Sequence, residues 1–290
     1  MTLGIDTVGA IDVHTHVQIS DSGHCSLDGA LMEASAKYFK VGGNRQPTIP
    51  EIADHYRSLN MLAVIFPVDA EHATGVARIS NFEVAQACRV HADVLIPFAS
   101  IDPWKGKAAV EEARKLVGEH GIRGFKFHPS LQGIPANDKV AYPLYSAIEE
   151  LGVTALFHTG QTGIGAGLPG GGGIHLRYSN PMFIDDVAAD FPGLKIILAH
   201  PSFPWQDEAL AVATHKANVF IDLSGWSPKY FPPQLVHYAN TLLQDKVLFG
   251  SDYPFIDPVD WVKAFDQLEI KPEVRSKILK ANAARLLGLA

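Results

Sequence analysis

Short apolar segments rich in β-branched residues recur along the chain, and amphipathic stretches with the helical period separate them. Apolar runs that alternate with helices are typical of parallel strands covered by helices. Eight such runs in 290 residues indicate a closed (β/α)₈ barrel, or TIM barrel, rather than an open sheet. The expected strands are Ala10–His16, Met61–Val68, Val94–Ile101, Ile122–His128, Val153–His158, Lys195–His200, Asn218–Leu223 and Val247–Ser251. The clearest helical stretches are Arg78–His91, Lys107–His120, Asp138–Leu151, Phe183–Phe191 and the tail Glu273–Leu289.

Two connections between these elements are long. One follows the first strand, at about 17–50, and the other follows the fifth, at about 159–181, with the run GQTGIGAGLPGGGG. Loops of this length are usually functional in a compact domain, and both belong to the carboxyl ends of strands, where barrels build active sites. The glycine run can instead be a surface loop without a contact role. Because no linker or repeat interrupts the pattern, we expect one domain over residues 1–290.

Composition narrows the class of protein. Hydrophobic residues make up 47% of the chain and charged residues 19%, the balance of a folded globular protein. The net charge of −7 and the lack of a Lys/Arg cluster argue against nucleic-acid binding. We see no signal peptide and no apolar run of about 18 residues that could span a membrane, so a cytoplasmic location is expected. Cys25 and Cys88 are too few for a disulfide framework, and neither is expected to act as a nucleophile.

The first chemical signal is the motif Asp12-Val-His14-Thr-His16 at the end of the first expected strand. With a side-chain period of two, we expect all three polar side chains to point to one face. Two imidazoles at this spacing can chelate one metal ion. A lone His-x-His pair is weak evidence by itself.

Three further strands end on a residue that can bind metal or titrate. These are His158 after the fifth strand, His200 after the sixth and Asp252 after the eighth. Strand ends lie side by side in a closed barrel, so distant segments converge on one site. The convergence of four segments makes coincidence a poor explanation.

The motifs IDVHTH, FHTG, PMFIDDVAADFPGLKIILAHPSFPW and LFGSDYPF resemble the amidohydrolase superfamily. More narrowly, they resemble its second family, the branch related to aminocarboxymuconate-semialdehyde decarboxylase. The resemblance runs from Ile11 to Leu287. It implies that His14, His16, His158 and Asp252 bind one divalent ion and that His200 handles protons beside it.

The chemistry of these residue types agrees with that set. A catalytic site for one metal ion needs about three protein ligands and an open position, and a carboxylate can serve as ligand, general base or both. We therefore expect one divalent ion, zinc first and manganese or iron as alternatives. His200 and Asp252 are the expected catalytic groups. Alternatively, Asp252 is a helix cap and His200 a core histidine.

Substrate contacts are expected from five further residues, which are Lys126, His128, Arg177, Tyr178 and Trp205. Lys126 and His128 share a face at the end of the fourth strand, and a lysine there suits an anionic substrate. The alternative is a carboxylated Lys126 that bridges two metals, as in binuclear members of the superfamily. Arg177 offers two parallel hydrogen bonds to a carboxylate, or else is a solvated loop residue. Asp222 and Trp226 flank the end of the seventh strand, where they can line the pocket, although packing in the core or at the rim fits Trp226 better.

Three functions remain open from the sequence. The first is hydrolysis of an ester, lactone, amide or β-keto bond in a small anionic, cyclic or aromatic compound by a metal-activated water. The second is non-oxidative decarboxylation of an aromatic or unsaturated acid. The third is a barrel that has lost its metal and serves as a binding scaffold. The intact ligand set argues against the third, and the sequence analysis favours hydrolysis modestly. A homodimer is compatible with the sequence.

Overall fold

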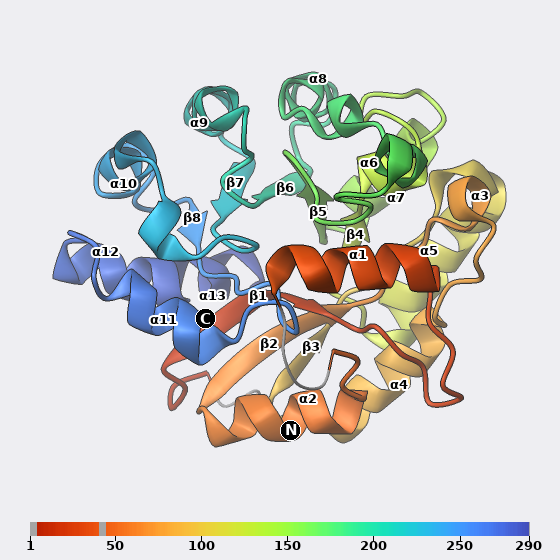
Figure 1. Cartoon of the computed structure of the whole chain (residues 1–290), viewed down its shortest axis with the longest axis horizontal. Coiled ribbons are helices and arrows are strands. Elements are labelled where there is room, and N and C mark those ends of the chain that lie inside the picture. The colour runs from red at the N-terminus through yellow and green to blue at the C-terminus, as the bar shows by residue number, and fades with distance from the viewer. Residues whose placement is uncertain (1–4, 41–44, 290) are drawn as a thin grey trace.

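Eight parallel strands form a closed barrel in the computed structural model, which describes residues 5–40 and 45–289 (Figure 1). The strands are β1 (Ala10–His16), β2 (Met61–Phe66), β3 (Leu95–Pro97), β4 (Gly124–Phe127), β5 (Thr154–His158), β6 (Lys195–Ala199), β7 (Val219–Asp222) and β8 (Val247–Leu248). Strands β1 to β3 pair in order, and so do β4 to β8. The expected (β/α)₈ barrel is therefore confirmed, although several strands are shorter than predicted.

Two seams join these groups of strands into a barrel. At one seam, Ala99 after β3 pairs with Phe125 of β4. At the other, Thr15 of β1 pairs with Tyr253 after β8, and the N–H of Val13 donates to the carbonyl of Phe249 at 3.0 Å. Backbone hydrogen bonds thus run around the whole ring, which leaves no open strand edge.

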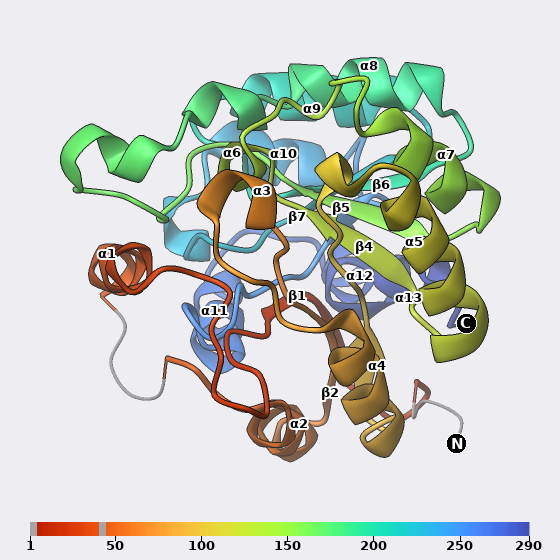
Figure 2. The same ribbon diagram turned by 90° about the vertical axis from the view of Figure 1, so that its right-hand side faces the viewer.

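Helices surround the strands on the outside (Figure 2). The α-helices of the first half are α1 (Gly29–Phe39), α2 (Ile49–Ser58), α3 (Glu71–Thr74), α4 (Asn81–Val90), α5 (Lys107–His120) and α6 (Pro129–Gln132). Those of the second half are α7 (Tyr142–Glu150), α8 (Met182–Asp190), α9 (Gln206–His215), α10 (Pro233–Ala239), α11 (Pro258–Phe265), α12 (Pro272–Ser276) and α13 (Asn282–Leu286). Short 3₁₀ turns are η1 (Pro103–Lys105), η2 (Pro169–Gly173), η3 (Leu176–Ser179) and η4 (Pro228–Tyr230), and a π-helical turn, η5, spans Lys277–Ala281.

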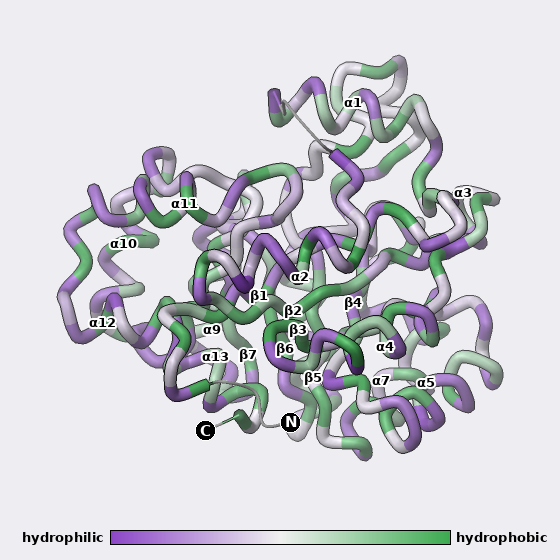
Figure 3. Tube along the Cα trace, turned by 90° about the horizontal axis from the view of Figure 1, so that it is seen from below, coloured by the Kyte–Doolittle hydropathy of each residue, from purple (hydrophilic) through white to green (hydrophobic). Residues whose placement is uncertain are grey.

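Because side chains alternate between the two faces of each strand, two hydrophobic cores form, one inside the barrel and one between the strands and the outer helices. On β5, Leu156 packs inside the barrel, whereas Ala155 and Phe157 pack against the outer helices. Hydrophobic stretches accordingly follow the strands in Figure 3. His158 continues the inward series two residues after Leu156, so the strand period delivers its imidazole to the interior at the carboxyl end.

Strand β1 departs from this alternation. Its pairing with β2 shifts register between Asp12 and Thr15, which is a β-bulge. Asp12 and Thr15 both hydrogen-bond the hydroxyl of Tyr56 on α2, so they face outward, whereas His14 and His16 face each other with their Nε2 atoms 3.3 Å apart. The expectation that Asp12 shares a face with both histidines is therefore wrong, because the bulge breaks the period of two.

Helix α1 lies in the long connection after β1 and stands apart from the ring of outer helices (Figures 1 and 2). Asp28 begins it by accepting a hydrogen bond from the N–H of Ala30 at 2.7 Å. Its other end rests on the glycine run after β5, since a Cβ on Gly163 would lie 2.6 Å from the Phe39 ring. The two long connections thus pack against each other over the carboxyl ends of the strands. Residues 41–44 of the predicted first loop lie outside the described residues.

Within the described chain, we find no helix long and apolar enough to cross a membrane.

Candidate active site

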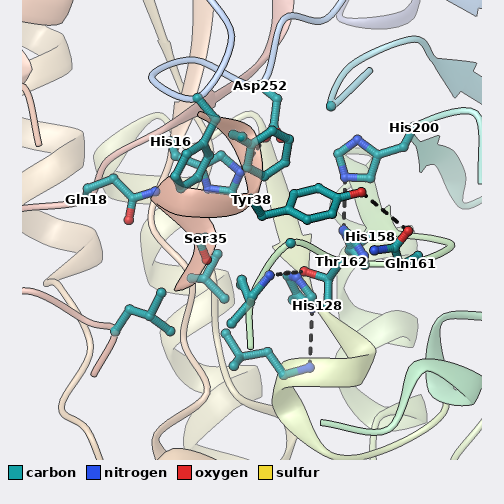
Figure 4. Close-up of a pocket in the computed structure, with 18 of the residues that line it drawn as sticks. His16, Gln18, Ser35, Tyr38, His128, His158, Gln161, Thr162, His200 and Asp252 are labelled. Carbon is teal, nitrogen blue, oxygen red and sulfur yellow. Dashed lines mark hydrogen bonds and ion pairs between the residues drawn. The ribbon is translucent and has the colours of Figure 1, made fainter. Parts of the chain in front are cut away.

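The polar residues predicted at the strand ends meet in one pocket at the carboxyl end of the barrel (Figure 4). His16 from β1, His158 from β5 and Asp252 from the loop after β8 line it, together with His128 and His200. His14 lies directly behind His16 and is fully buried. The closed barrel is what brings these segments together, because neighbouring strands end around one axis.

Three acceptor atoms converge at the base of this pocket. His16 Nε2 lies 2.9 Å from Asp252 Oδ1, and His14 Nε2 lies 3.3 Å from the same oxygen. Burial alone would raise the pKa of Asp252, but the neighbouring imidazoles of His16 and His14 outweigh burial and lower the pKa to about 2. A set of facing lone pairs around one ionised carboxylate is the arrangement that a cation stabilises.

Asp222 and Ser224 orient His14 from behind. Asp222 Oδ2 lies 3.0 Å from His14 Nδ1, and the hydroxyl of Ser224 lies 2.9 Å from the same nitrogen. A proton on Nδ1 shared with the carboxylate leaves Nε2 free as an acceptor, which is the usual support of a metal-binding histidine. Burial lowers the pKa of His14 well below its ordinary value, so the ring is neutral near pH 7.

Lys126 lies beneath His14 rather than in the pocket. Its Nζ lies 3.1 Å from His14 Nε2 and 4.9 Å from the centre of the Phe66 ring. Because its side chain is fully buried, its pKa falls to about 7. Its predicted roles, in substrate binding or as a carboxylated bridge, both remain predictions.

His158 and His200 form a second pair beside this cluster. His158 Nδ1 lies 2.9 Å from His200 Nε2, and His200 Nδ1 lies 3.0 Å from the carbonyl oxygen of Ser224. Since that carbonyl can only accept, His200 carries its proton on Nδ1, and His158 then donates from Nδ1. Burial lowers the pKa of both rings.

This tautomer leaves His158 Nε2 as a free acceptor. That atom is buried and has no hydrogen-bond partner among the described residues. A buried lone pair without a donor is costly unless a ligand meets it. His14, His16 and Asp252 come close enough together to share an ion, and His158 lines the same pocket with this unpaired nitrogen. The donor set therefore fits a divalent metal.

A second group, His14, His200 and Asp222, is also close enough to share an ion. Its facing nitrogens are already engaged, since His14 Nδ1 bonds Asp222 and His200 Nδ1 bonds the Ser224 carbonyl. We therefore interpret this group as the support of the first cluster.

Backbone strain is concentrated at the same site. His200 has φ 73°, Ser202 φ 64° and Asp252 φ 75°, all in the left-handed region that residues with a Cβ avoid. Strain of this kind persists where the surrounding structure enforces a position that the site requires. Two of these three residues are the catalytic groups predicted from the sequence.

The wall of the pocket is mainly apolar and aromatic. Its apolar members include Tyr38, Phe39, Leu131, Ile164, Trp226 and Phe255. Phe39 of α1 stacks on Phe255 with ring centres 5.0 Å apart. Figure 4 shows Tyr38 reaching across the pocket, where its hydroxyl lies 3.4 Å from the side-chain oxygen of Gln161. Such a wall suits a flat, largely apolar ligand.

Besides Lys126, three more of the predicted substrate contacts lie outside the pocket. Arg177 is exposed on η3, where its guanidinium lies over the ring of Tyr178, and neither residue lines the pocket. Trp205 is the residue before α9 and does not line the pocket either. His128 does line it, stacked on His158 with ring centres 3.9 Å apart.

Sequence reasoning missed several residues of the site. Gln18 and Ser224 each lie two residues beyond a residue that was singled out, His16 and Asp222, so the strand period could have found them. Nothing in the sequence pointed to Ser35, Tyr38 and Phe39, because α1 was interpreted as part of a loop.

The fold is that of a barrel enzyme whose site has a donor set that fits a divalent metal, and the comparisons with known proteins agree with this class. The family model described as Amidohydrolase matches residues 11–289, and the chain belongs to this family. The family predicted from the sequence motifs is thus confirmed.

Two curated proteins are similar to this chain over most of its length. The 2-amino-3-carboxymuconate-6-semialdehyde decarboxylase of Dictyostelium discoideum is 22% identical over 96% of this chain and 91% of its own length. The gamma-resorcylate decarboxylase of Rhodococcus jostii (strain RHA1) is 25% identical over 80% of this chain and 82% of its own.

Solved structures share the fold. A TIM-barrel protein of Bordetella bronchiseptica has a TM-score of 0.79 and 24% identity over 97% of this chain and 98% of its own. The 5-carboxyvanillate decarboxylase of Novosphingobium aromaticivorans, solved with manganese, has a TM-score of 0.69 and 15% identity over 99% of both chains. A probable 2-pyrone-4,6-dicarboxylic acid hydrolase of Acinetobacter baumannii has a TM-score of 0.64 and 18% identity over 97% of this chain and 100% of its own.

Proposed function

We propose that this enzyme is a divalent-metal-dependent decarboxylase of a small aromatic or unsaturated carboxylic acid. The observation that carries the proposal is the convergence of His14 Nε2, His16 Nε2 and Asp252 Oδ1 at the base of an aromatic-walled pocket. The two curated relatives described above are decarboxylases, and each matches most of the chain. This support favours decarboxylation over the hydrolysis that the sequence analysis preferred.

Four residues would hold the ion, which are His14, His16, His158 and Asp252. When bound, the ion supplies positive charge that attracts anionic oxygens of a substrate. Because manganese is present in one decarboxylase of the same fold, manganese and zinc are both candidates. His14 is kept in the correct orientation by Asp222, and His158 by its hydrogen bond to His200.

The reaction breaks one carbon–carbon bond, leaves the electron pair on the substrate and needs one proton at that carbon. Asp252, with its pKa near 2, is ionised at neutral pH and so first accepts a proton from substrate or solvent. It then passes this proton to the carbon that loses the carboxyl group. His200 also lines the pocket and helps to position the reacting groups as a neutral imidazole. Its hydrogen bond to the Ser224 carbonyl holds the ring in place.

The test combines metal content with CO₂ release. Protein purified without chelator should contain about one equivalent of divalent metal and release CO₂ from 2,6-dihydroxybenzoate. His158→Ala and Asp252→Asn should lose metal or about a thousandfold of the activity while the barrel stays folded. His215→Ala, which changes an exposed histidine on α9, is the matched control and should match the unmodified enzyme.

Three outcomes would change the proposal. CO₂ release by metal-free protein would rule out the metal mechanism. Cleavage of an ester or lactone without CO₂ release from any acid would restore hydrolysis as the function. About two equivalents of metal would indicate a carboxylated Lys126 that bridges two ions.

A further inference from the structure

The pocket contains almost no fixed positive charge. Among the described residues that line it, none is lysine or arginine, and the chargeable side chains are His16, His128, His158, His200 and Asp252. His128 Nδ1 accepts a hydrogen bond from the N–H of Leu131 at 3.3 Å, and His200 Nε2 accepts one from His158 Nδ1 at 2.9 Å, so both rings are neutral. His158 presents the unpaired Nε2 to the proposed metal position. Anionic groups of a substrate therefore meet positive charge only at the proposed metal position.

The two cationic side chains that the sequence analysis singled out are turned to other partners. Lys126 lies beneath His14 with no exposed surface. Arg177, which the sequence suggested as a carboxylate clamp, is exposed and stacked on Tyr178. A second carboxylate in the pocket would thus be removed from water without an ion pair, which is strongly unfavourable.

Gln18 presents a neutral polar group instead. Its side chain lines the pocket two residues after His16 and is only 8% exposed. Its amide has no hydrogen bond to any other described residue, so its two N–H donors and its carbonyl acceptor are available to a ligand. Gln161 adds an amide whose oxygen is occupied by Tyr38. Figure 4 shows Gln18 beside His16 and Gln161 at the other side of the pocket.

We propose that the substrate is an aromatic acid with a single carboxylate and neutral hydrogen-bonding substituents, one of which Gln18 recognises. This inference rests on the proposed function, since it takes the departing carboxyl group as the single charge. One divalent ion and the ionised Asp252 together carry one positive charge, which balances one carboxylate. A second carboxylate would lack a counter-charge, whereas a hydroxyl or methoxy group would pair with an amide.

A matched pair of ligands tests whether the pocket accepts only one carboxylate. 2,6-Dihydroxybenzoate and 3-hydroxyphthalate differ in that one hydroxyl is replaced by a second carboxylate. Calorimetry should show that the monocarboxylate binds the metal-loaded enzyme about a hundredfold more tightly, and CO₂ release should show the same preference in kcat/KM. Equal binding of the dicarboxylate would overturn the inference.

Variants at Gln18 test the residue. Gln18→Arg supplies the missing cation and should shift the preference toward 3-hydroxyphthalate by about tenfold or more. Gln18→Leu removes the amide with little change in size and should weaken binding of 2,6-dihydroxybenzoate by about tenfold. Gln267→Arg adds the same charge at an exposed position and should leave both affinities unchanged. An unaltered preference in Gln18→Arg would show that Gln18 does not face the substrate.

Ligand preference tests the substrate inference, and CO₂ release tests decarboxylation, so the two proposals can fail separately. If the monocarboxylate binds preferentially and Gln18→Arg reverses this preference, but no CO₂ appears, the substrate class stands and decarboxylation is wrong. If CO₂ appears from both acids with equal efficiency, decarboxylation stands and the substrate inference is wrong.

Discussion

Gly225 places the chain against the ring of His200. A Cβ at this position would lie 2.5 Å from His200 Nδ1, and the residue has φ +72°, where side chains are strained. His200 Nδ1 also donates to the Ser224 carbonyl, so any shift of the ring disturbs its tautomer as well as its position. Glycine at this one position is therefore part of the site.

Gly225→Ala should lower kcat by about tenfold to a hundredfold, because His200 must move. The left-handed backbone should add a loss of stability of about 1 kcal/mol. Gly75→Ala is the matched control, since Gly75 has φ +69° with no atom within 4 Å of the added Cβ. It should lose similar stability and keep its kcat. Steady-state kinetics and thermal unfolding measure both effects, and equal kcat values in the two variants would contradict this interpretation.

Helix α1 shapes the pocket although it is not part of the barrel. Ser35, Tyr38 and Phe39 line the mouth, and contact with Gly163 ties the helix to the loop after β5. A helix that rests on a glycine-rich segment can pack closely because no side chain intervenes. We therefore expect this element to contribute to ligand binding more than to the stability of the core.

Phe39→Ala should raise KM by about tenfold while kcat and the melting temperature change little, because the ring packs on Phe255 at the mouth rather than in the core. Tyr230→Ala removes an aromatic ring that is 62% exposed outside the pocket and serves as the control. A large fall in melting temperature without a change in KM would show that α1 is a structural element only.

At the scale of the whole molecule, unfolding exposes groups that the folded barrel holds in their neutral form. Cys88 on α4 is 2% exposed, in the core shared by α2, α4 and β2. Burial raises the pKa of its thiol far above the ordinary value of 9.0. In the unfolded chain the thiol ionises near that value. The stability that Cys88 contributes is therefore fully present below about pH 9 and is lost as the pH rises above it.

Between pH 8 and pH 10, Cys88 should account for a loss of about 1.4 kcal/mol in the free energy of unfolding. Urea unfolding of Cys88→Ala should show a smaller loss over this interval than the unmodified protein. Cys25→Ala, which removes the less buried thiol, should keep the larger loss. The same pH dependence in all three proteins would contradict this assignment.

The sequence by itself determined the barrel and the histidine and aspartate residues that meet in its site. The strand runs and their order predicted a closed barrel, and the residues that follow the strands predicted where His16, His128, His158, His200 and Asp252 would meet. These predictions depend on local period and on the fact that parallel strands end together. The motifs around the same residues identified the family.

Only the tertiary structure decided the rest. The bulge in β1 turned Asp12 away from the histidines, the packing of α1 added Tyr38 and Phe39, and η3 left Arg177 in solvent. None of these results follows from a local pattern, because each depends on contacts between segments distant in the chain. Periodicity specifies the face on which a side chain lies within a regular strand. Bulges and long connections have no fixed period, so packing determines which of their side chains reach the site.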